Sequence, residues 1–235
     1  MQVVKPSAEV FFHMPQVLGG IAGEAPHPKM MELIEPPLFL ELVGRSCYKS
    51  EDKITEGSAG KFIKMLRDRG HHAMLEHCVA SARFVCDRGV SHELVRHRLA
   101  AWAQESTRYC NYTKGRFGGQ IAVIDPPEAC ITTDKVKPDE LLGRRYTLFQ
   151  LIEEQYQWEI ERGILPQIAR GVLPTCLKTE IWITANLREW MHIFSLRMDG
   201  ATGAPHPQMK ELMELIRPIF AKHIPELFAP PVAVE

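Results

Sequence analysis

Residues 96–109 combine basic, hydroxyl and amide side chains in a way that suits the binding of a phosphate group. The segment reads Arg-His-Arg-Leu-Ala-Ala-Trp-Ala-Gln-Glu-Ser-Thr-Arg-Tyr. Arg96 and Arg98 flank a histidine, while Ser106 and Arg108 add a hydroxyl and a guanidinium that can donate hydrogen bonds to phosphate oxygens. A solvated basic helix end is the competing interpretation, because cations are favourable near a helix C-terminus.

The local sequence places the start of this segment on a helix that follows a strand and continues to Leu99. Ser91 can cap this helix, and Glu93 falls in the first turn, where the helix dipole favours an acid. On a helix, Arg96 and Arg98 would diverge by about 200°, because successive residues are about 100° apart. We therefore expect the two arginines to serve different ligands or different parts of one ligand.

The composition is that of an ordinary globular protein. Its 235 residues are enough for one well-cored domain and short for two. Hydrophobic residues make up 45% of the chain and charged residues 24%. The net charge of −1 disfavours a nucleic-acid-binding protein, which needs a basic surface to displace counterions. Of the 28 cations, 16 are arginines, which suit bidentate binding of a small phosphorylated or carboxylated ligand.

The first residues and the cysteines predict a cytoplasmic protein with reduced thiols and no membrane partner. Residues 1–15 lack a long apolar stretch, and no run approaches the roughly 18 apolar residues of a membrane span. The six cysteines show no Cys-x-x-Cys spacing. The crowding of His71, His72, His77 and Cys78 makes a zinc site an alternative, although the spacing matches no standard ligand pattern.

Hydrophobic periodicity predicts an α+β fold, with a mixed or antiparallel sheet flanked by helices. Besides the helix that ends at Leu99, we expect strands at 10–13, 79–86, 120–124 and 179–184, and helices at 28–34, 37–44, 58–69, 139–163, 187–198 and 208–223.

The helix predicted for residues 187–198 has a defined start and one apolar face. Asn186 can cap it, and Glu189 three residues later completes a capping-box-like arrangement. Arg197 falls within about 20° of Trp190, at one flank of the apolar face. A cation in that position needs a partner, unless its side chain extends past Trp190 to solvent.

The Arg-His-Arg sequence, followed by seven residues, a serine and then Arg-Tyr, resembles the signature of the flavin-dependent thymidylate synthases. Six segments in all resemble that family in the same order along the chain: residues 45–48, 70–77, 96–109, 168–174, 184–188 and 196–197. The matches span roughly residues 37–220. The resemblance therefore implies the fold of the thymidylate synthase-complementing proteins, as a single domain over residues 1–235.

By this resemblance, one set of residues binds dUMP and a second set binds FAD. The dUMP set is Glu93, Leu94, Val95, Arg96, Gln104, Glu105, Ser106, Thr107, Arg108, Arg170 and Arg197. The FAD set is Cys47, His71, Ala73, Glu76, Arg96, His97, Arg98, Gln104, Asn186, Leu187, Arg188 and His192. Ser106, Arg108 and Arg170 are expected on the phosphate, and no metal is expected.

The implied reaction is the reductive methylation of dUMP to dTMP. NADPH reduces bound FAD, and the reduced flavin delivers the one-carbon unit of methylenetetrahydrofolate to C5 of dUMP. Arg197 is the expected catalytic residue and stabilises an N3-deprotonated uracil electrostatically, since a guanidinium is a poor proton acceptor near neutral pH. The resemblance also implies a homotetramer with sites shared between subunits.

Some positions depart from the commonest family pattern, and two other function classes stay open. The departures are Cys47, Ala73, Glu93, Ala101 and Gln104. At Ala73 the lost hydroxyl removes a hydrogen bond worth about 0.5–1.5 kcal/mol, which would weaken FAD retention. A non-catalytic flavin- or nucleotide-binding module would keep the arginines without turnover. A metal-dependent hydrolase built on the histidines would need a divalent ion.

Overall fold

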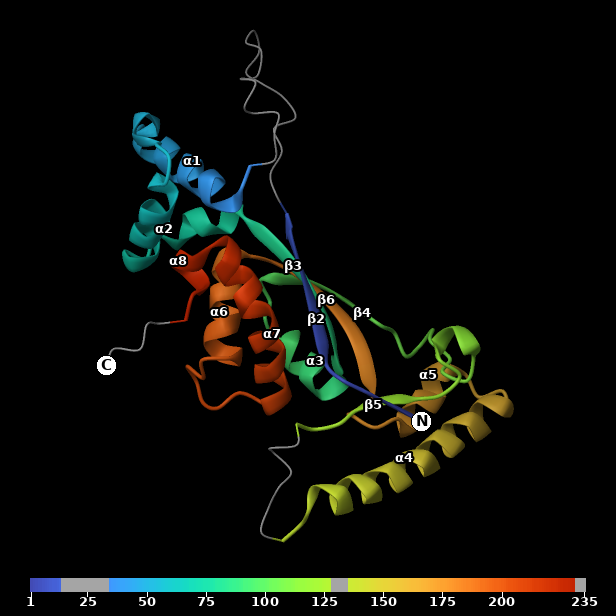
Figure 1. The fold of residues 1–235 in the computed structure, drawn as a ribbon. Helices are drawn as coiled ribbons and strands as arrows, with labels where there is room; N and C mark the ends of the chain where they lie inside the picture. The colour runs from blue at the N-terminus through green and yellow to red at the C-terminus, as the bar shows by residue number, and fades with distance from the viewer. Residues whose placement is uncertain (14–33, 128–134, 231–235) are drawn as a thin grey trace. The chain divides into compact units, whose positions relative to one another are not determined.

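The computed structural model of the chain describes residues 1–13, 34–127 and 135–230 (Figure 1). The chain divides into two compact units that interleave along the sequence. Unit 1 comprises Met1–Glu9, Arg83–Ile183 and Ala204–Leu212, and unit 2 comprises Val10–Ala82, Thr184–Gly203 and Met213–Glu235. Each unit is described by itself below.

The strands of the described residues form two sheets. The four-stranded sheet has the order β2-β3-β6-β4, built from β2 (Ser7–His13), β3 (Val79–Asp87), β6 (Lys178–Asn186) and β4 (Ala100–Gln104). The second sheet is a parallel pair of β1 (Gln2–Val4) and β5 (Ala122–Ile124), in which Val3 is the partner of Val123. Side chains of β6 alternate between more exposed and buried positions, as expected for a strand whose neighbouring side chains point to opposite faces.

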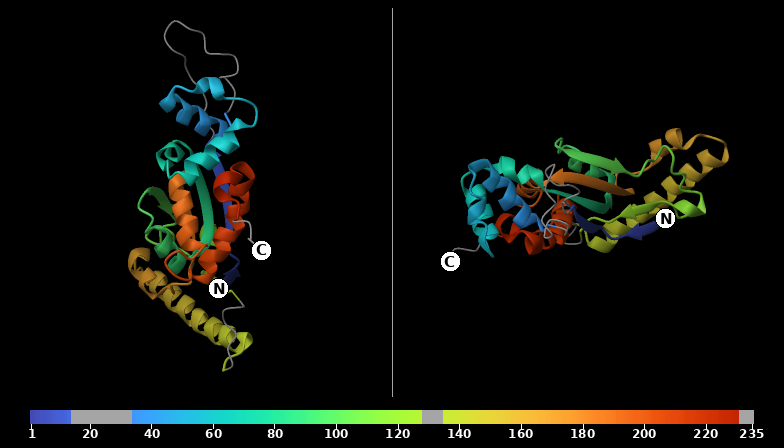
Figure 2. Two further views of the ribbon diagram at one scale, coloured as in Figure 1. Left: turned by 90° about the vertical axis from the view of Figure 1, so that its left-hand side faces the viewer. Right: turned by 90° about the horizontal axis from the view of Figure 1, so that it is seen from above.

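Unit 1 holds the helices α3 (Arg88–Leu94), α4 (Pro138–Glu161) and α5 (Pro166–Ala169), together with the short 3-10 turns η4 (Gly115–Phe117) and η6 (Arg170–Val172). Figure 2 shows α4 as one long helix beside β5 and α5. Its buried residues Phe149, Glu153 and Tyr156 repeat at helical spacing. The backbone N–H of Ile121, just before β5, donates to Glu153 Oε1 at 2.7 Å, which fixes α4 to the β1–β5 pair.

Unit 2 holds α1 (Pro36–Tyr48), η2 (Glu51–Lys53), α2 (Ser58–Asp68), η3 (His72–His77), α6 (Leu187–Arg197) and α8 (Pro225–Phe228). Helix α7 (Pro207–His223) begins in unit 1 and continues into unit 2. Aromatic side chains form much of the core of unit 2. The Trp190 ring lies 4.8 Å from that of Phe220, and Phe220 lies 5.0 Å from Phe228, between ring centroids. The indole N–H of Trp190 donates to the carbonyl of Ala80 at 3.0 Å, so α6 is fixed to β3 by a buried hydrogen bond.

The predicted α+β class is confirmed, and most predicted elements are present with ends shifted by a few residues. The predicted cap of α6 is confirmed as well, because Asn186 Oδ1 accepts a hydrogen bond from the Glu189 N–H at 2.9 Å. The helix predicted for 28–34 lies outside the described residues, apart from its last residue. Whether residues 1–235 act as one domain remains a prediction.

The prediction for the helix before the arginine-rich segment was wrong at both ends. Helix α3 starts at Arg88 and ends at Leu94, and a strand, β4, follows where none was predicted. The cap is Asp87, whose Oδ1 accepts from the Val90 N–H at 2.7 Å. Ser91 is instead buried within the helix and donates to the carbonyl of Arg88 at 2.9 Å. An acid at the end of β3 thus starts the helix without an intervening loop.

Among the residues that the structure describes, no helix combines the length and the apolar character needed to cross a membrane.

Replacing Asp87 by alanine should destabilise the protein by about 0.5–2 kcal/mol, because the first turn of α3 loses its cap. The carboxylate also accepts from Gln208 Nε2 at 3.1 Å, which places the expected loss toward the upper end of that range. The measurement is the free energy of unfolding in urea. Asp87→Asn keeps a capping oxygen and should recover most of the loss. Equal destabilisation by the two substitutions would contradict the role of the cap.

Candidate functional site

The arginine-rich segment forms a turn between α3 and β4 rather than a helical face. The N–H groups of Arg96 and His97 donate to the carbonyls of Glu93 and Leu94, at 3.2 and 3.1 Å. Arg96 and Arg98 are exposed, whereas His97 is only 4% exposed. The carbonyl of His97 accepts from Trp102 Nε1 at 3.1 Å, which closes the turn. The expected 200° divergence on a helix therefore does not apply to these arginines.

A pocket of about 290 Å³ in unit 1 brings two arginines together, and we call it the arginine pocket. Its polar side chains are those of Arg88, His92, Thr107, Arg170 and Thr175, and its other lining residues are Gly171, Leu173, Pro174 and Leu177. Arg170 Nη1 donates to Thr107 Oγ1 at 3.2 Å. That bond links η6 to the segment after β4, so two stretches predicted separately to bind dUMP meet here.

Arg88 lies at the start of α3 and is only partly exposed. Its Nη1 makes two long hydrogen bonds, to Thr179 Oγ1 at 3.3 Å and to the carbonyl of Glu105 at 3.4 Å. Neither Arg88 nor Arg170 forms an ion pair with an acid in the described part of the chain. All nine lining residues of the arginine pocket are non-acidic. Arg88 is partly buried, whereas Arg170 is exposed. A partly buried cation without a carboxylate favours an anionic ligand, because buried charge requires a counter-charge.

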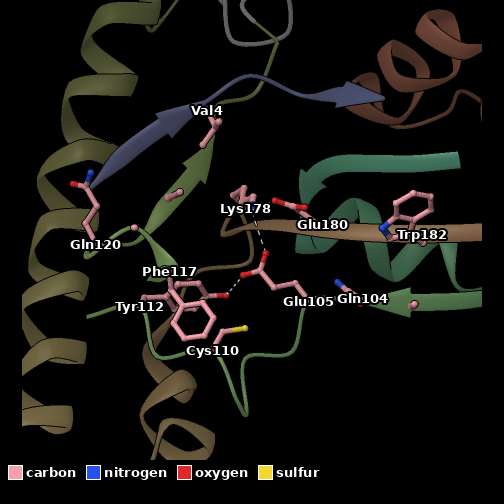
Figure 3. A pocket seen from close by; sticks show the side chains of 13 residues that line it. Val4, Gln104, Glu105, Cys110, Tyr112, Phe117, Gln120, Lys178, Glu180 and Trp182 are labelled. Atoms are coloured by element: carbon pink, nitrogen blue, oxygen red, sulfur yellow. Dashed lines mark hydrogen bonds and ion pairs between the residues drawn. The ribbon is translucent and has the colours of Figure 1, made fainter. Parts of the chain in front are cut away.

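A second pocket of unit 1, of about 610 Å³, is lined by two further residues predicted to bind dUMP (Figure 3). Gln104 and Glu105 line it together with Tyr112, Phe117 and Trp182. We call it the aromatic pocket. Glu105 accepts from the Tyr112 hydroxyl at 2.7 Å and from Lys178 Nζ at 3.1 Å, and both bonds are visible in Figure 3.

The ion pair between Glu105 and Lys178 continues into a chain of alternating charges. Lys178 Nζ donates to Glu180 at 2.7 Å, Glu180 accepts from Arg83 at 2.5 Å, and Arg83 also donates to Glu9 at 3.1 Å. Hydrogen bonds from Lys178 and Arg83 lower the pKa of Glu180. Burial alone would lower the pKa of Lys178, but hydrogen bonds to the two carboxylates outweigh it and raise that pKa.

Burial raises the pKa of Tyr112, and the hydrogen bond to the Glu105 carboxylate adds to this shift. Tyr112 therefore stays a neutral donor to Glu105. With both oxygens of its carboxylate engaged, Glu105 holds residues 104–106 in place against β6. Its backbone N–H adds a bond of 2.9 Å to the carbonyl of Glu180. The side chain of Glu105 thus has a positioning role in this geometry.

The remaining residues predicted for dUMP occupy different environments. Ser106 Oγ accepts from the Arg108 N–H at 3.3 Å, and the Arg108 guanidinium lies 5.4 Å from the centroid of the Tyr109 ring, exposed to solvent. Leu94 is fully buried, so its side chain belongs to the core. Val95 is 39% exposed. Gln104 donates to Ser91 Oγ at 2.8 Å and to Thr179 Oγ1 at 3.1 Å.

In unit 2, the structure brings several residues predicted for FAD together where η3 packs on α6. Arg188 Nη1 pairs with Glu76 Oε1 at 2.6 Å, and both side chains are about half exposed. His71 Nδ1 lies 3.4 Å from the Tyr48 hydroxyl, and His192 is exposed. The residue that follows the α6 cap, Leu187, is fully buried and contributes to the core. The Arg188–Glu76 ion pair therefore joins α6 to η3 at an exposed position.

Cys47 and Ala73 are exposed as well, and the Cys47 thiol lies 3.8 Å from the sulfur of Met74. Arg197, the last residue of α6, is partly buried and engaged in an interaction within the chain. Its placement agrees with the expectation that a cation beside the Trp190 face needs a partner.

Sequence reasoning missed Arg88 and His92 as pocket residues. The signal was present in their spacing, because positions 88 and 92 are one helical turn apart on α3 and therefore share a face. Because Ser91 was predicted to cap this helix, position 88 was not recognised as helical. The histidine cluster at residues 71–78 is not assembled as a metal site, and no group of three or more metal-ligating side chains occurs within the described ranges.

The lowered pKa of Glu180 predicts a pH-dependent contribution to stability. Because the folded pKa lies below the ordinary value of 4.5, the contribution is fully present above that pH and is lost as the pH falls through the folded value. Glu180→Gln should be less stable than the wild type near neutral pH, and this difference should shrink as the pH is lowered below 4.5 and through the folded pKa. Urea unfolding at several pH values measures it. Glu154→Gln, at an exposed position of α4, is the control. A difference that is independent of pH would contradict the ion-pair chain.

A family model described as thymidylate synthase complementing protein matches residues 31–226. The chain is 33% identical over 171 residues to a flavin-dependent thymidylate synthase of Mycobacterium avium, covering 68% of this chain and 67% of that protein. It is 35% identical over 173 residues to one of Pyrococcus horikoshii, covering 73% and 68%. The chain thus spans about two thirds of the length of the curated relatives it matches.

The fold resembles the crystal structure of PolB from Streptomyces cacaoi, a UMP/dUMP methylase bound with 5-Br dUMP. The TM-score is 0.73 at 21% identity, over 97% of this chain and 95% of that one. At this identity the likeness concerns the fold. The family match over most of the chain carries the assignment, and the curated relatives agree with it. This chain belongs to the thymidylate synthase complementing protein family.

Proposed function

We propose that this protein is an FAD-dependent thymidylate synthase that converts dUMP to dTMP. Methylenetetrahydrofolate is the proposed one-carbon donor and NADPH the proposed reductant. The family match and the names of the relatives support this function, as does the UMP/dUMP methylase with a related fold. The relatives are matched over about two thirds of their length. The assignment of the whole reaction to this chain is therefore a proposal.

The observation that carries the proposal is the arginine pocket. A nucleoside monophosphate presents a dianion, and this pocket offers two guanidinium groups, an imidazole and two hydroxyls without a competing acid among its lining residues. Its volume of about 290 Å³ is at the lower end of the usual range for ligand pockets, which suits one end of a nucleotide. We assign the phosphate of dUMP to Arg170 and Thr107, with Arg88 and His92 as additional donors.

The other predicted dUMP residues extend this assignment along the chain. Ser106 and Arg108 follow β4 directly and flank Thr107, so backbone and side-chain donors of one short segment serve the same ligand. Glu93, in the last turn of α3, and Arg96, in the turn that follows α3, can pair with each other near the nucleotide. Gln104, Glu105, Leu94 and Val95 contribute through backbone groups and by holding the segment in position.

The surface where η3 meets α6 fits the flavin proposed for this family. Arg188 and His192 present donors one turn apart on α6, and His71 presents a donor at the start of η3. Donors of this kind match the carbonyl, ring-nitrogen and phosphate acceptors of FAD. Glu76 already orients the Arg188 guanidinium at 2.6 Å. The rest of the proposed flavin set is Cys47, Ala73, Arg96, His97, Arg98, Gln104, Asn186 and Leu187. Bound FAD reduced by NADPH would supply the reducing equivalents of the reaction.

Arg197 is the proposed catalytic residue. Its fixed positive charge would stabilise a uracil deprotonated at N3, which makes C5 more nucleophilic without a covalent enzyme adduct. A guanidinium remains protonated in proteins, so its contribution is electrostatic. We further propose a cytoplasmic homotetramer whose partners are dUMP, the folate and NADPH.

Replacing Arg88 tests the phosphate assignment. Arg88→Gln should weaken dUMP binding about tenfold to a hundredfold, because a hydrogen bond to a charged group contributes about 1.5–3 kcal/mol. Binding of deoxyuridine, which lacks the phosphate, should stay nearly unchanged. Titration calorimetry with both ligands measures the ratio of the two dissociation constants. Arg69→Gln, at an exposed arginine of unit 2, is the matched control. An unchanged ratio for Arg88→Gln would remove this residue from the phosphate site.

The catalytic assignment predicts that the purified protein shows flavin absorbance and forms dTMP only when dUMP, methylenetetrahydrofolate and NADPH are all present. Arg197→Ala should lose most turnover while remaining folded, as measured by circular dichroism, because the substitution removes the electrostatic stabilisation of the transition state. Product is measured by chromatography, and NADPH oxidation by absorbance. A protein that neither binds FAD nor makes dTMP would defeat the proposed function. Near-normal dTMP formation by Arg197→Ala would exclude a catalytic role for Arg197 and leave the proposed function standing.

A further inference from the structure

A closed set of hydrogen bonds in unit 1 begins and ends at Arg88, and we call it the Arg88 network. The Arg88 guanidinium donates to Thr179 Oγ1 at 3.3 Å, and Gln104 Nε2 donates to the same oxygen at 3.1 Å. Gln104 Nε2 also donates to Ser91 Oγ at 2.8 Å, and the Ser91 hydroxyl donates to the main-chain carbonyl of Arg88 at 2.9 Å. The network therefore ties the guanidinium of Arg88 to the backbone of the same residue.

The hydroxyl of Ser91 fixes the direction of these bonds. A hydroxyl has one proton, and that of Ser91 is used on the carbonyl of Arg88, so its oxygen can only accept from Gln104. An amide nitrogen carries two protons, which match the two acceptors that Gln104 reaches. A carboxylate of the same size has no proton to donate when it is ionised. The Arg88 network therefore requires the amide of Gln104.

The Arg88 network lies where water does not readily replace a lost bond. Ser91 and Thr179 are fully buried, and Arg88 and Gln104 are partly buried. Removing one member leaves buried polar atoms without a partner, which costs more free energy than the bond itself contributes. The orientation of the Arg88 side chain consequently depends on which residue occupies position 104.

The Arg88 network holds the guanidinium without neutralising its charge. The other members contribute two hydroxyls and an amide, and the second acceptor of the guanidinium is the carbonyl of Glu105 at 3.4 Å. Within the described part of the chain, both bonds of the guanidinium come from Nη1. The remaining N–H groups and the full positive charge are thus left to a ligand of the arginine pocket.

We propose that Gln104 is a positioning residue of the phosphate site and sets its capacity for an anion, because a neutral amide orients Arg88 and leaves the guanidinium charge to the ligand. The ligand class is a phosphate monoester. An acid at position 104 would place a negative charge beside Thr179 Oγ1 and compete with the ligand for Arg88. The inference rests on the proposed dUMP site and deepens it, since Gln104 acts there through Arg88.

The first test compares two substitutions of Gln104 that differ in charge. Gln104→Glu should raise the dissociation constant of dUMP about tenfold or more, because the new carboxylate pairs with Arg88. Gln104→Leu breaks the Arg88 network without adding charge and should raise that constant by less, about twofold to tenfold. Binding of deoxyuridine, which lacks the phosphate, should stay nearly unchanged in both variants. Titration calorimetry measures the four dissociation constants.

The matched control is Gln150→Glu, which makes the same change at an exposed position of α4 and should bind dUMP as the wild type does. Circular dichroism establishes that the variants are folded. A folded Gln104→Glu variant with the wild-type ratio of the dUMP and deoxyuridine constants would overturn the proposal.

The second test asks whether Gln104 acts through Arg88. In a double-mutant cycle with Arg88→Gln, Gln104→Leu should weaken dUMP binding little further, because the guanidinium that it orients is already absent. The same factor in both backgrounds would refute the positioning role. Should the Gln104 variants fail to fold, Thr179→Val and Thr179→Ser replace them. Thr179→Val loses the shared acceptor and should weaken dUMP binding, Thr179→Ser should restore it, and equal weakening by both would count against the network.

Binding of inorganic phosphate, followed by phosphorus NMR, tests the site apart from methylation. A wild-type protein that binds phosphate and dUMP but forms no dTMP would contradict the proposed function and leave the role of Gln104 standing. A protein that forms dTMP, and whose Gln104→Glu variant binds dUMP and phosphate normally, would contradict the role of Gln104 alone. A wild type that binds neither ligand would overturn the inference.

Discussion

The hydroxyl of Thr179 is the interaction on which the arginine pocket depends. This residue of β6 is fully buried, and its Oγ1 accepts from Arg88 at 3.3 Å and from Gln104 at 3.1 Å. Gln104 in turn donates to Ser91 at 2.8 Å. One hydroxyl therefore joins α3, the end of β4 and β6. It engages a single nitrogen of the Arg88 guanidinium and leaves the others available to a ligand.

The alternation of side chains along strand β6 separates the ion-pair chain from the hydrogen bonds that hold Arg88. Thr179 points to the buried side, whereas Lys178 and Glu180 lie on the other side and join the ion-pair chain of the aromatic pocket. That chain also holds Glu105, whose carboxylate bonds to Tyr112 and Lys178. The acid next in sequence to the proposed phosphate-binding segment, Glu105, is thus bonded within the aromatic pocket and does not line the arginine pocket. An unpaired carboxylate there would compete with an anionic ligand for the same guanidinium donors.

The predictable parts of the fold were those with strong periodicity and local capping. Asn186 caps α6 as predicted, because the interaction involves residues three apart. The strand at residues 100–104 escaped prediction, since Ala-Ala-Trp-Ala-Gln contains no β-branched residue and forms a strand through its pairing with β6. Arg88 escaped for a related reason. Its orientation depends on Thr179, 91 positions away along the chain, which local patterns do not reveal.

The turn at residues 96–98 explains why its two arginines are separated by a single residue. His97 is 4% exposed, and its carbonyl is bonded to the indole of Trp102. The buried middle residue anchors the turn, and the flanking Arg96 and Arg98 are consequently held at the surface. On a continuous helix, the histidine would be 100° from each arginine and would not have to be buried. The turn therefore presents two arginine side chains at the surface and is anchored in the core by His97.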